Sequence, residues 1–200
     1  YAILRVLAEL VTCSLAGYAF ARMRFRGRKV IFFLLLTVLM VPGQIFLIPQ
    51  YQMVDAAGLL DNFFAILAPG LVSAFGVFFM MQYFRRIPEE LVDAAKLDGC
   101  NPWQMFWKVM LPLARPALFS FGVITLLSAW NSLLWPLVVI NSTEKYPVAV
   151  GLAMLQGDHL VGPDYPMIMA ASLMAMAPVF IAFAIMQKKV IEGFALSSFR

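Results

Sequence analysis

The sequence has 200 residues, of which 62% are hydrophobic and 13% are charged, and its mean hydropathy is +0.85. These values exclude an ordinary soluble globular domain and indicate a chain whose solvent is the lipid bilayer. The formal net charge of +4 is modest, and the sequence predicts no concentrated basic face for a nucleic-acid partner.

Five stretches approach the roughly 20 apolar residues that a helix needs to cross the hydrocarbon. They are residues 1–21, 30–47, 63–83, 117–140 and 167–186. The first carries Arg5 and Glu9, which is tolerable if that end lies at the interface, where the arginine can snorkel and pair with the glutamate one turn later. The other four contain no charged residue. The sequence therefore predicts an all-α polytopic membrane bundle that forms a single transmembrane domain over residues 1–200.

Four of these stretches contain a proline, at Pro42, Pro69, Pro136 and Pro178. Each proline removes an intrahelical hydrogen bond that lipid cannot replace, so we expect a bend at each one. The bends are either packing kinks or flexible points around a translocation path, and the sequence does not separate the two.

The basic residues sort to one side. The connectors after the first and third stretches and the tail hold 13 of the 15 lysines and arginines, whereas the connectors 48–62 and 141–166 contribute only Lys145. Because basic residues favour the cytoplasmic side, the prediction is a multi-pass protein of the bacterial cytoplasmic (inner) membrane with a cytoplasmic C-terminus. The chain starts at Tyr1, inside an apolar run and without an initial Met, and we expect a preceding span in a longer protein.

The sequence offers no energy source of its own. The last four stretches lack the ionisable groups that a proton- or sodium-coupled carrier needs, and no GxxxxGK[ST] phosphate loop occurs. No paired acid and base, catalytic residue, metal-binding spacing or cofactor site is predicted, so the chain is not expected to be an enzyme. Energy would come from a partner, which directs attention to the cytoplasmic connector at about 85–116.

The first half of this connector reads as a short helix of about 11 residues. Pro88 fits the first helical position, Glu89 and Glu90 complement the positive end of the helix, and Gly99 follows the last turn, where a left-handed residue is needed. Ala94, Ala95 and Leu97 give it a slim surface among charges, which suits insertion into a groove on a soluble partner. The alternative is a mere amphipathic linker.

The second half reads as another helix, in which Asn101 is the cap, Pro102 the first residue and Pro112 the stop. An apolar stripe with helical spacing would lie on the membrane interface or on neighbouring helix ends; it consists of Trp103, Phe106, Trp107 and Met110.

At these residues the chain resembles the permease subunits of ABC importers, whose cytoplasmic "EAA" loop continues to a glycine four residues later and ends on an apolar-x-Leu-Pro sequence. Asp93-Ala94-Ala95, Gly99 and the run 109–112 match this pattern, with Asp93 in place of the usual glutamate. Asp93 keeps the charge but shortens the reach, and Glu90 nearby could share its role. The resemblance implies that the ATPase-coupling residues are Glu90, Asp93, Ala94, Ala95, Leu97, Asp98, Gly99, Leu111 and Pro112.

The resemblance covers nearly the whole chain, including GYAFARMRFRGRK, GLLDNFFA and AWNSLLWPL, and its nearest pattern is the smaller maltose-type permease of the carbohydrate branch. It implies a type I importer fold with six spans, five of them in this chain. The implied partners are a second permease subunit, a pair of ATPase subunits that hold ATP and Mg, an extracytoplasmic solute-binding protein and a sugar-like solute. The connector 141–166 would face the binding protein, with Asp158, His159 and Asp164 as solvated loop residues.

Four residues are candidates for the solute path, because an aromatic face can stack on a sugar while polar groups bond its hydroxyls; they are Ser128, Trp130, Asn131 and Trp135. Interface anchoring and helix packing are the competing interpretation. At the level of the whole protein, the alternative to an ATP-driven permease is a membrane channel or scaffold whose loop binds a cytosolic partner without energy coupling. The identity of the solute is not predicted.

Overall fold

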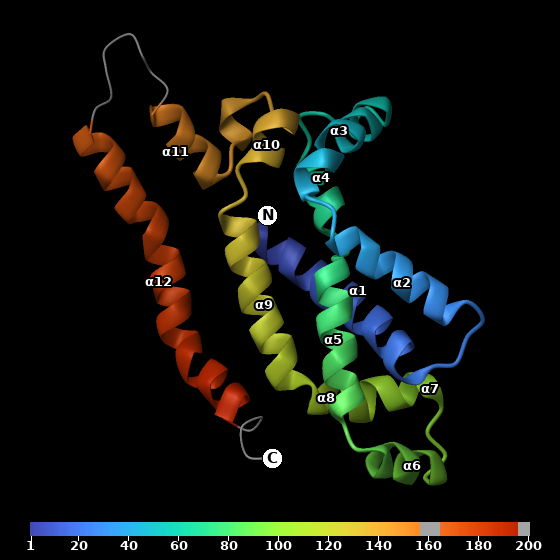
Figure 1. The fold of residues 1–200 in the computed structure, drawn as a ribbon. Helices are drawn as coiled ribbons and strands as arrows, with labels where there is room; N and C mark the ends of the chain where they lie inside the picture. Colours follow the sequence, from blue (N-terminus) through green and yellow to red (C-terminus); the bar gives the residue numbers. More distant parts are fainter. Residues whose placement is uncertain (157–164, 196–200) are drawn as a thin grey trace.

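The computed structural model describes residues 1–156 and 165–195, and all regular structure within these ranges is helical. Helix α1 (Ala2–Arg22) packs against α5 (Ala74–Arg86) and α9 (Arg115–Trp130). Helix α12 (Tyr165–Ala195) packs on α9, and α2 (Arg28–Leu39) packs on α5, so that α12, α9, α5 and α2 follow one another across the molecule (Figure 1). The all-α prediction is confirmed.

The first predicted stretch is one uninterrupted helix of 21 residues, as expected. Its Arg5 and Glu9 do form an ion pair, with 3.0 Å between Nε and Oε1. Glu9 is only 3% exposed, and its other oxygen accepts a hydrogen bond from Thr125 of α9 at 3.2 Å. The Arg5 side chain is 21% exposed. The predicted pairing is therefore confirmed, and a neighbouring helix supplies a further polar partner for Glu9. Snorkelling of Arg5 to a membrane interface stays a prediction.

The second predicted stretch is shorter than expected. Helix α2 ends at Leu39, and after Pro42 the chain continues as the 3₁₀ helix η1 (Gly43–Phe46) and as α3 (Leu47–Ala56). The two parts meet at 100°. Twelve residues of α-helix span only about 18 Å. The proline predicts such a break, since it lacks a donor N–H and disfavours α geometry at the residue before it.

The third stretch bends by 44° between the pair α4 (Phe63–Leu67) and η2 (Ala68–Gly70) and helix α5. Pro69 lies just before the break, which confirms the bend predicted there. Helix α5 starts again because the Ser73 hydroxyl accepts a hydrogen bond from the backbone N–H of Gly76 at 3.2 Å.

The fourth stretch, 117–140, is also interrupted. Helix α9 ends at Trp130 and α10 (Leu134–Val139) follows, so the break precedes Pro136 rather than coinciding with it. Pro136 is the third residue of α10, where a backbone N–H has no intrahelical acceptor anyway, and the proline is tolerated there. The 3₁₀ turn η4 (Thr143–Lys145) and α11 (Val148–Gln156) complete this part of the chain.

The fifth stretch lies inside α12, which continues through Pro178. Among the described helices, α1 alone is by itself long and apolar enough to cross a membrane. The number rises to four if each of three bent pairs crosses as one unit. Asp158, His159 and Asp164 lie outside the described residues.

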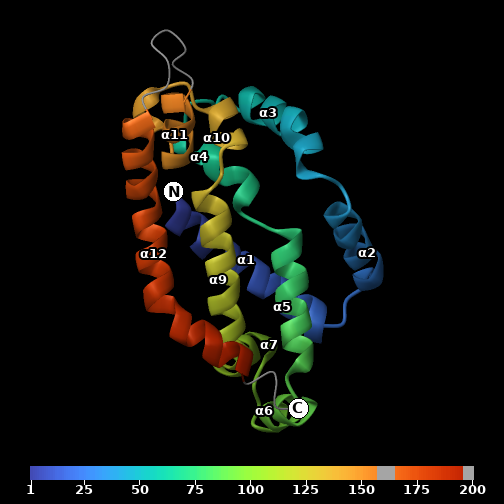
Figure 2. The ribbon, with the colours of Figure 1, turned by 60° about the vertical axis from the view of Figure 1, so that its left-hand side comes forward.

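The molecule has two distinct ends (Figures 1 and 2). Helices α3, α4, α10 and α11 gather at one end, and the loop between α5 and α9 forms the other. The connector 48–62 and the described part of the connector 141–166 thus share the end opposite to the loop 85–116. At that loop, buried residues of α1 and α5 join the core with residues of the loop itself.

Candidate functional site: the loop between α5 and α9

The first half of the loop is helix α6 (Glu89–Leu97), nine residues long. Its N-cap is Pro88, with extended backbone geometry, so the helix begins one residue later than the sequence suggested. Glu89 and Glu90 occupy the first turn, as predicted, where negative charge is favourable.

The turn at Gly99, which ends α6 and is called the joint below, has the predicted left-handed conformation. Gly99 has φ of +80°, its N–H donates to the Lys96 carbonyl, and the Cys100 N–H donates to the Ala95 carbonyl, both at 3.0 Å. These two bonds make a Schellman motif, which ends a helix through a residue in the left-handed conformation. Glycine alone adopts that conformation without a Cβ penalty, so the prediction for Gly99 is confirmed.

The second half starts with α7 (Pro102–Gln104), and the predicted cap is present. The Asn101 side chain accepts from the Gln104 N–H at 2.8 Å, while the Gln104 side chain accepts from the Asn101 N–H at 3.1 Å. This reciprocal pair is a capping box, which satisfies two backbone donors at the helix start.

The predicted apolar stripe of this half is split. Residues Met105–Met110 form a π-helical segment, η3, in which hydrogen bonds run to the fifth residue rather than the fourth. Phe106 and Met110 are buried as expected, but Trp103 and Trp107 are 61% and 44% exposed in this chain. The rings of Trp103, Phe106 and Trp107 remain in mutual contact, with centroids 5.1–6.2 Å apart, so one side of the stripe is buried and the side with the two tryptophans is exposed.

Pro112 does not end the helical segment, which continues through α8 (Leu111–Leu113) before it meets α9 at 75°. In an α-helix a proline ring clashes with the carbonyl four residues earlier. The π segment just before Pro112 is a known way to accommodate such a residue. Leu111 and Pro112 therefore lie within the segment and are half-buried.

Helix α6 has two different faces. Val92 and Ala95 point into the core, and Ala95, which we expected on the exposed surface, is only 7% exposed. On the outer face, Leu97 is 89% exposed. The other exposed coupling candidates on α6 and its joint are Glu90, Ala94, Asp98 and Gly99. Because an α-helix has 3.6 residues per turn, Ala95 faces the core while Ala94 and Leu97 face outward. The EAA-like motif by itself did not show which of its residues is buried.

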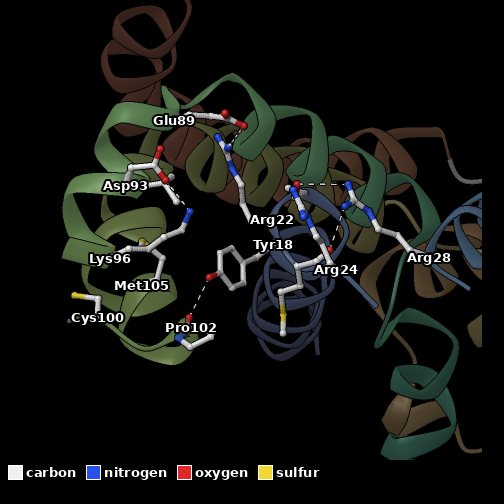
Figure 3. Close-up of a pocket in the computed structure, with 13 residues that line it drawn as sticks. Tyr18, Arg22, Arg24, Arg28, Glu89, Asp93, Lys96, Cys100, Pro102 and Met105 are labelled. Atoms are coloured by element: carbon white, nitrogen blue, oxygen red, sulfur yellow. Dashed lines mark hydrogen bonds and ion pairs between the residues drawn. The ribbon is translucent and has the colours of Figure 1, made fainter. Parts of the chain in front are cut away.

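Asp93 lies one turn before Leu97, at the edge of the exposed face of α6 that borders α1. Its carboxylate accepts a hydrogen bond from Lys96 at 2.7 Å, and both side chains remain exposed. They line a cavity of about 840 Å³ between α6 and the end of α1 (Figure 3). Basic residues from the end of α1, the following connector and the start of α2 line it as well, namely Arg22, Arg24 and Arg28.

The sequence analysis missed two residues at this cavity, Tyr18 and Arg22. The Tyr18 hydroxyl donates to the Pro102 carbonyl at 3.1 Å. Arg22 donates through Nη2 to the carbonyls of Phe84, at 2.8 Å, and Ile87, and its Nη1 lies 3.6 Å from a Glu89 oxygen. Both lie in the permease-like stretch GYAFARMRFRGRK, but only the fold reveals their partners.

Two of the four predicted path residues come together. Trp130 and Asn131 line a cavity of about 380 Å³ between α9, α11 and α12. The indole N–H of Trp130 donates to the Ala175 carbonyl at 3.2 Å. Ser128 is exposed but does not line this cavity.

Trp135 lies elsewhere. Its indole N–H donates to the Ala65 carbonyl at 2.8 Å, and its ring packs on the buried cluster that contains Val54 and Ile140. This side chain joins α10 to α4.

As for metals, the described residues include no group of three or more His, Cys, Asp or Glu side chains that could hold an ion.

Comparison with known proteins supplies the family context. The family model described as "Binding-protein-dependent transport system inner membrane component" matches residues 14–192. The chain is 37% identical over 188 residues to the arabinooligosaccharides transport system permease protein AraQ of Halalkalibacterium halodurans, covering 94% of this chain and 67% of the relative. It is 34% identical over 184 residues to the lactose transport system permease protein LacG of Rhizobium radiobacter, covering 92% and 67%.

A solved structure has the same helical arrangement. It is a bacterial ABC transporter involved in the import of the acidic polysaccharide alginate, with a TM-score of 0.83 and 30% identity, covering 94% of this chain and 71% of the matched one. The chain spans about two thirds of the length of the curated relatives it matches.

Proposed function

The chain belongs to the family of binding-protein-dependent transport system inner membrane components, and we propose that it moves a sugar-like solute through the membrane with energy delivered at α6 by a separate ATPase. Its all-helical fold is that of an ABC importer permease. In this family the permease is a membrane component, and the ATPase activity belongs to another subunit.

The outer face of α6 is the observation that carries the proposal. Leu97 is almost fully exposed at the tip of the molecule, beside the small side chain of Ala94 and the charged Glu90 and Asp98. A projecting helix with one apolar anchor and a small neighbour fits a groove on a soluble partner. Asp93 would join the contact by exchanging Lys96 for a cation of the ATPase.

The sugar class is supported by two observations. The relatives and the solved structure are named for arabino-oligosaccharides, lactose and alginate. The cavity between α9, α11 and α12 offers an indole ring, the Asn131 amide and the Ser172 hydroxyl, which suit stacking on a sugar and bonding to its hydroxyls. Trp130 and Asn131 are the proposed solute contacts, and Ser128 and Trp135 contribute to the helices that shape the path.

The proposed topology has five crossings in this chain and six in the full-length protein, with bent helices serving as spans. The loop 85–116 and the C-terminus face the cytoplasm, since 13 of the 15 basic residues lie on that side. The connectors 48–62 and 141–166 face outward toward a solute-binding protein. The complex would include a second permease subunit and a pair of ATPase subunits that bind ATP and Mg.

Substitution on the two faces of α6 tests the docking surface. In the full-length transporter, Leu97→Asp should reduce retention of the ATPase during purification by about tenfold or more, because it places a charge at the centre of the contact. Leu91→Asp is the matched control, because Leu91 is also exposed on α6 but lies about 120° around the helix from Leu97; it should leave retention within about twofold. Equal retention in both variants would refute docking through this face.

Solute flux measured without the ATPase addresses the rival function. A permease that depends on the ATPase should show no flux above that of empty liposomes. Continued flux would favour the channel or scaffold.

A further inference from the structure

The C-terminal part of α1 contacts the segments on both sides of α6. Tyr18 and Arg22 are four residues apart, so their side chains lie on the same face of the helix. Figure 3 shows both pointing toward the loop, with Arg22 reaching Glu89 and Tyr18 reaching Pro102. One helix thus contacts the residues that precede α6 and the residues that follow it.

Arg22 holds the start of α6. Its side chain is only 12% exposed, and the guanidinium donates to the carbonyls of Phe84, in the last turn of α5, and Ile87, just before Pro88. The carbonyls at a helix C-terminus carry partial negative charge, which favours a cation there. The planar fork of arginine can serve two acceptors at once, whereas a lysine ammonium cannot reproduce that geometry.

Tyr18 holds the other end, just after the Gly99 joint. Its hydroxyl donates to the carbonyl of Pro102, the first residue of α7. Its ring packs against Phe84 at a centroid distance of 6.1 Å and against Phe106 at 5.3 Å. The Tyr18 side chain therefore joins α5 and η3 as well as the joint.

We propose that Tyr18 and Arg22 form a two-point clasp that makes α6 and α1 move as one body, so that displacement of α6 by the ATPase is transmitted into the membrane through α1. A single attachment would let α6 pivot, whereas attachment at both ends resists rotation. Helix α1 packs on α5 and α9 along its length, so its movement reaches two further helices. This clasp rests on the proposed function of α6.

The transmission step is measured as solute molecules imported per ATP hydrolysed by the full transporter in proteoliposomes. Tyr18→Phe removes one hydroxyl and keeps the ring, and Arg22→Lys keeps the charge and removes the fork. Each should lower this ratio by about fivefold, which corresponds to the loss of one hydrogen bond from the clasp. ATPase subunits should still be retained at wild-type stoichiometry.

Arg26→Lys is the matched control, because Arg26 is an exposed arginine of the same connector. It should leave the ratio unchanged. Hydrogen exchange of the α6 amides should accelerate in Tyr18→Phe and Arg22→Lys and not in the control, since the clasp restrains the helix ends.

The clasp is overturned if Tyr18→Phe folds, retains the ATPase and imports at the wild-type ratio. It is also overturned if both variants lose the ATPase, because the residues would then serve docking rather than transmission. Failure of the proposed function looks different, since the wild-type protein itself would retain no ATPase.

Discussion

Helix α1 stabilises the molecule in different ways at its two ends. In its N-terminal half, Glu9 is buried between Arg5 of the same helix and Thr125 of α9, so one side chain depends on two others. At its C-terminal end, Arg22 donates mainly to backbone carbonyls of another segment. The Glu9 contact is sensitive to the identity of its partner side chains, whereas the Arg22 contact needs only the correct path of the backbone.

The difference has an energetic consequence. A buried ion pair that loses one member leaves an uncompensated charge away from water, which is strongly destabilising. Carbonyls beside the loop 85–116 that lose an arginine donor can be hydrated instead. We therefore expect the N-terminal half of α1 to govern stability and its C-terminal end to govern coupling.

The largest effect is expected at Glu9. Glu9→Leu should lower the free energy of unfolding by about 3 kcal/mol, because it leaves the partly buried Arg5 without a counter-charge. Thermal unfolding of the purified protein in nanodiscs measures this change. The double variant Arg5→Met, Glu9→Leu should regain much of the loss, and a double variant less stable than Glu9→Leu would contradict the buried-charge explanation.

A smaller effect is expected midway along α1, where the helix touches α5. A Cβ added at Gly17 would lie 2.7 Å from the Met80 Cβ and 2.9 Å from the Met81 backbone N, so Gly17→Ala must push the two helices apart. The expected cost is about 1–3 kcal/mol in the same unfolding measurement. Gly122→Ala is the control, since its nearest neighbour would be Leu10 at 3.6 Å, an ordinary contact. Equal stability of the two variants would argue against close packing of α1 on α5.

The smallest effect is expected at an exposed contact at the end of the molecule opposite to the loop 85–116, which tests the importance of burial. Asp61 accepts from Lys145 at 2.7 Å and from the Ser142 and Asn141 backbone N–H groups at 2.9 and 3.0 Å. The Lys145 ammonium, followed by the Ser142 hydroxyl and backbone N–H, holds the pKa of Asp61 below its ordinary value. Solvent screening limits the effect of such an exposed pair.

The pH dependence follows from the direction of that shift. Because the pKa of Asp61 is lower in the folded protein, its stabilising contribution is complete above the unfolded-state value of about 3.9 and declines as the pH falls below it. Wild type and Asp61→Asn should therefore differ in melting temperature at pH 7 and converge toward pH 3. A difference that grew on acidification would contradict this assignment.

Several local features could be predicted from the sequence because their partners lie within one helical turn. The spacing of Arg5 and Glu9 predicted their pairing, Gly99 predicted the left-handed joint, and Asn101 predicted the helix cap. The EAA-like pattern likewise predicted the permease family, and the family match confirms it. Each of these depends on residue types at short, fixed spacing.

Features that depend on distant segments required the structure. The burial of Ala95 and Glu9 depends on which helices cover them. The π turn at Met105–Met110 is not marked by the regular apolar spacing of the sequence. The indole of Trp135 donates to Ala65, 70 residues away, and nothing in the sequence predicted this bond.

The sequence by itself determined that this chain is a helical membrane permease component whose loop turns at Gly99. The length of the apolar stretches predicts the membrane helices, and the short-range spacing of the motif residues predicts the loop. Only the tertiary structure decided how the loop is attached. Tyr18 reaches across 84 positions to Pro102, and Arg22 reaches across 65 positions to Ile87. Their acceptors are backbone carbonyls, which every residue possesses, so no residue type in the sequence marks them as partners.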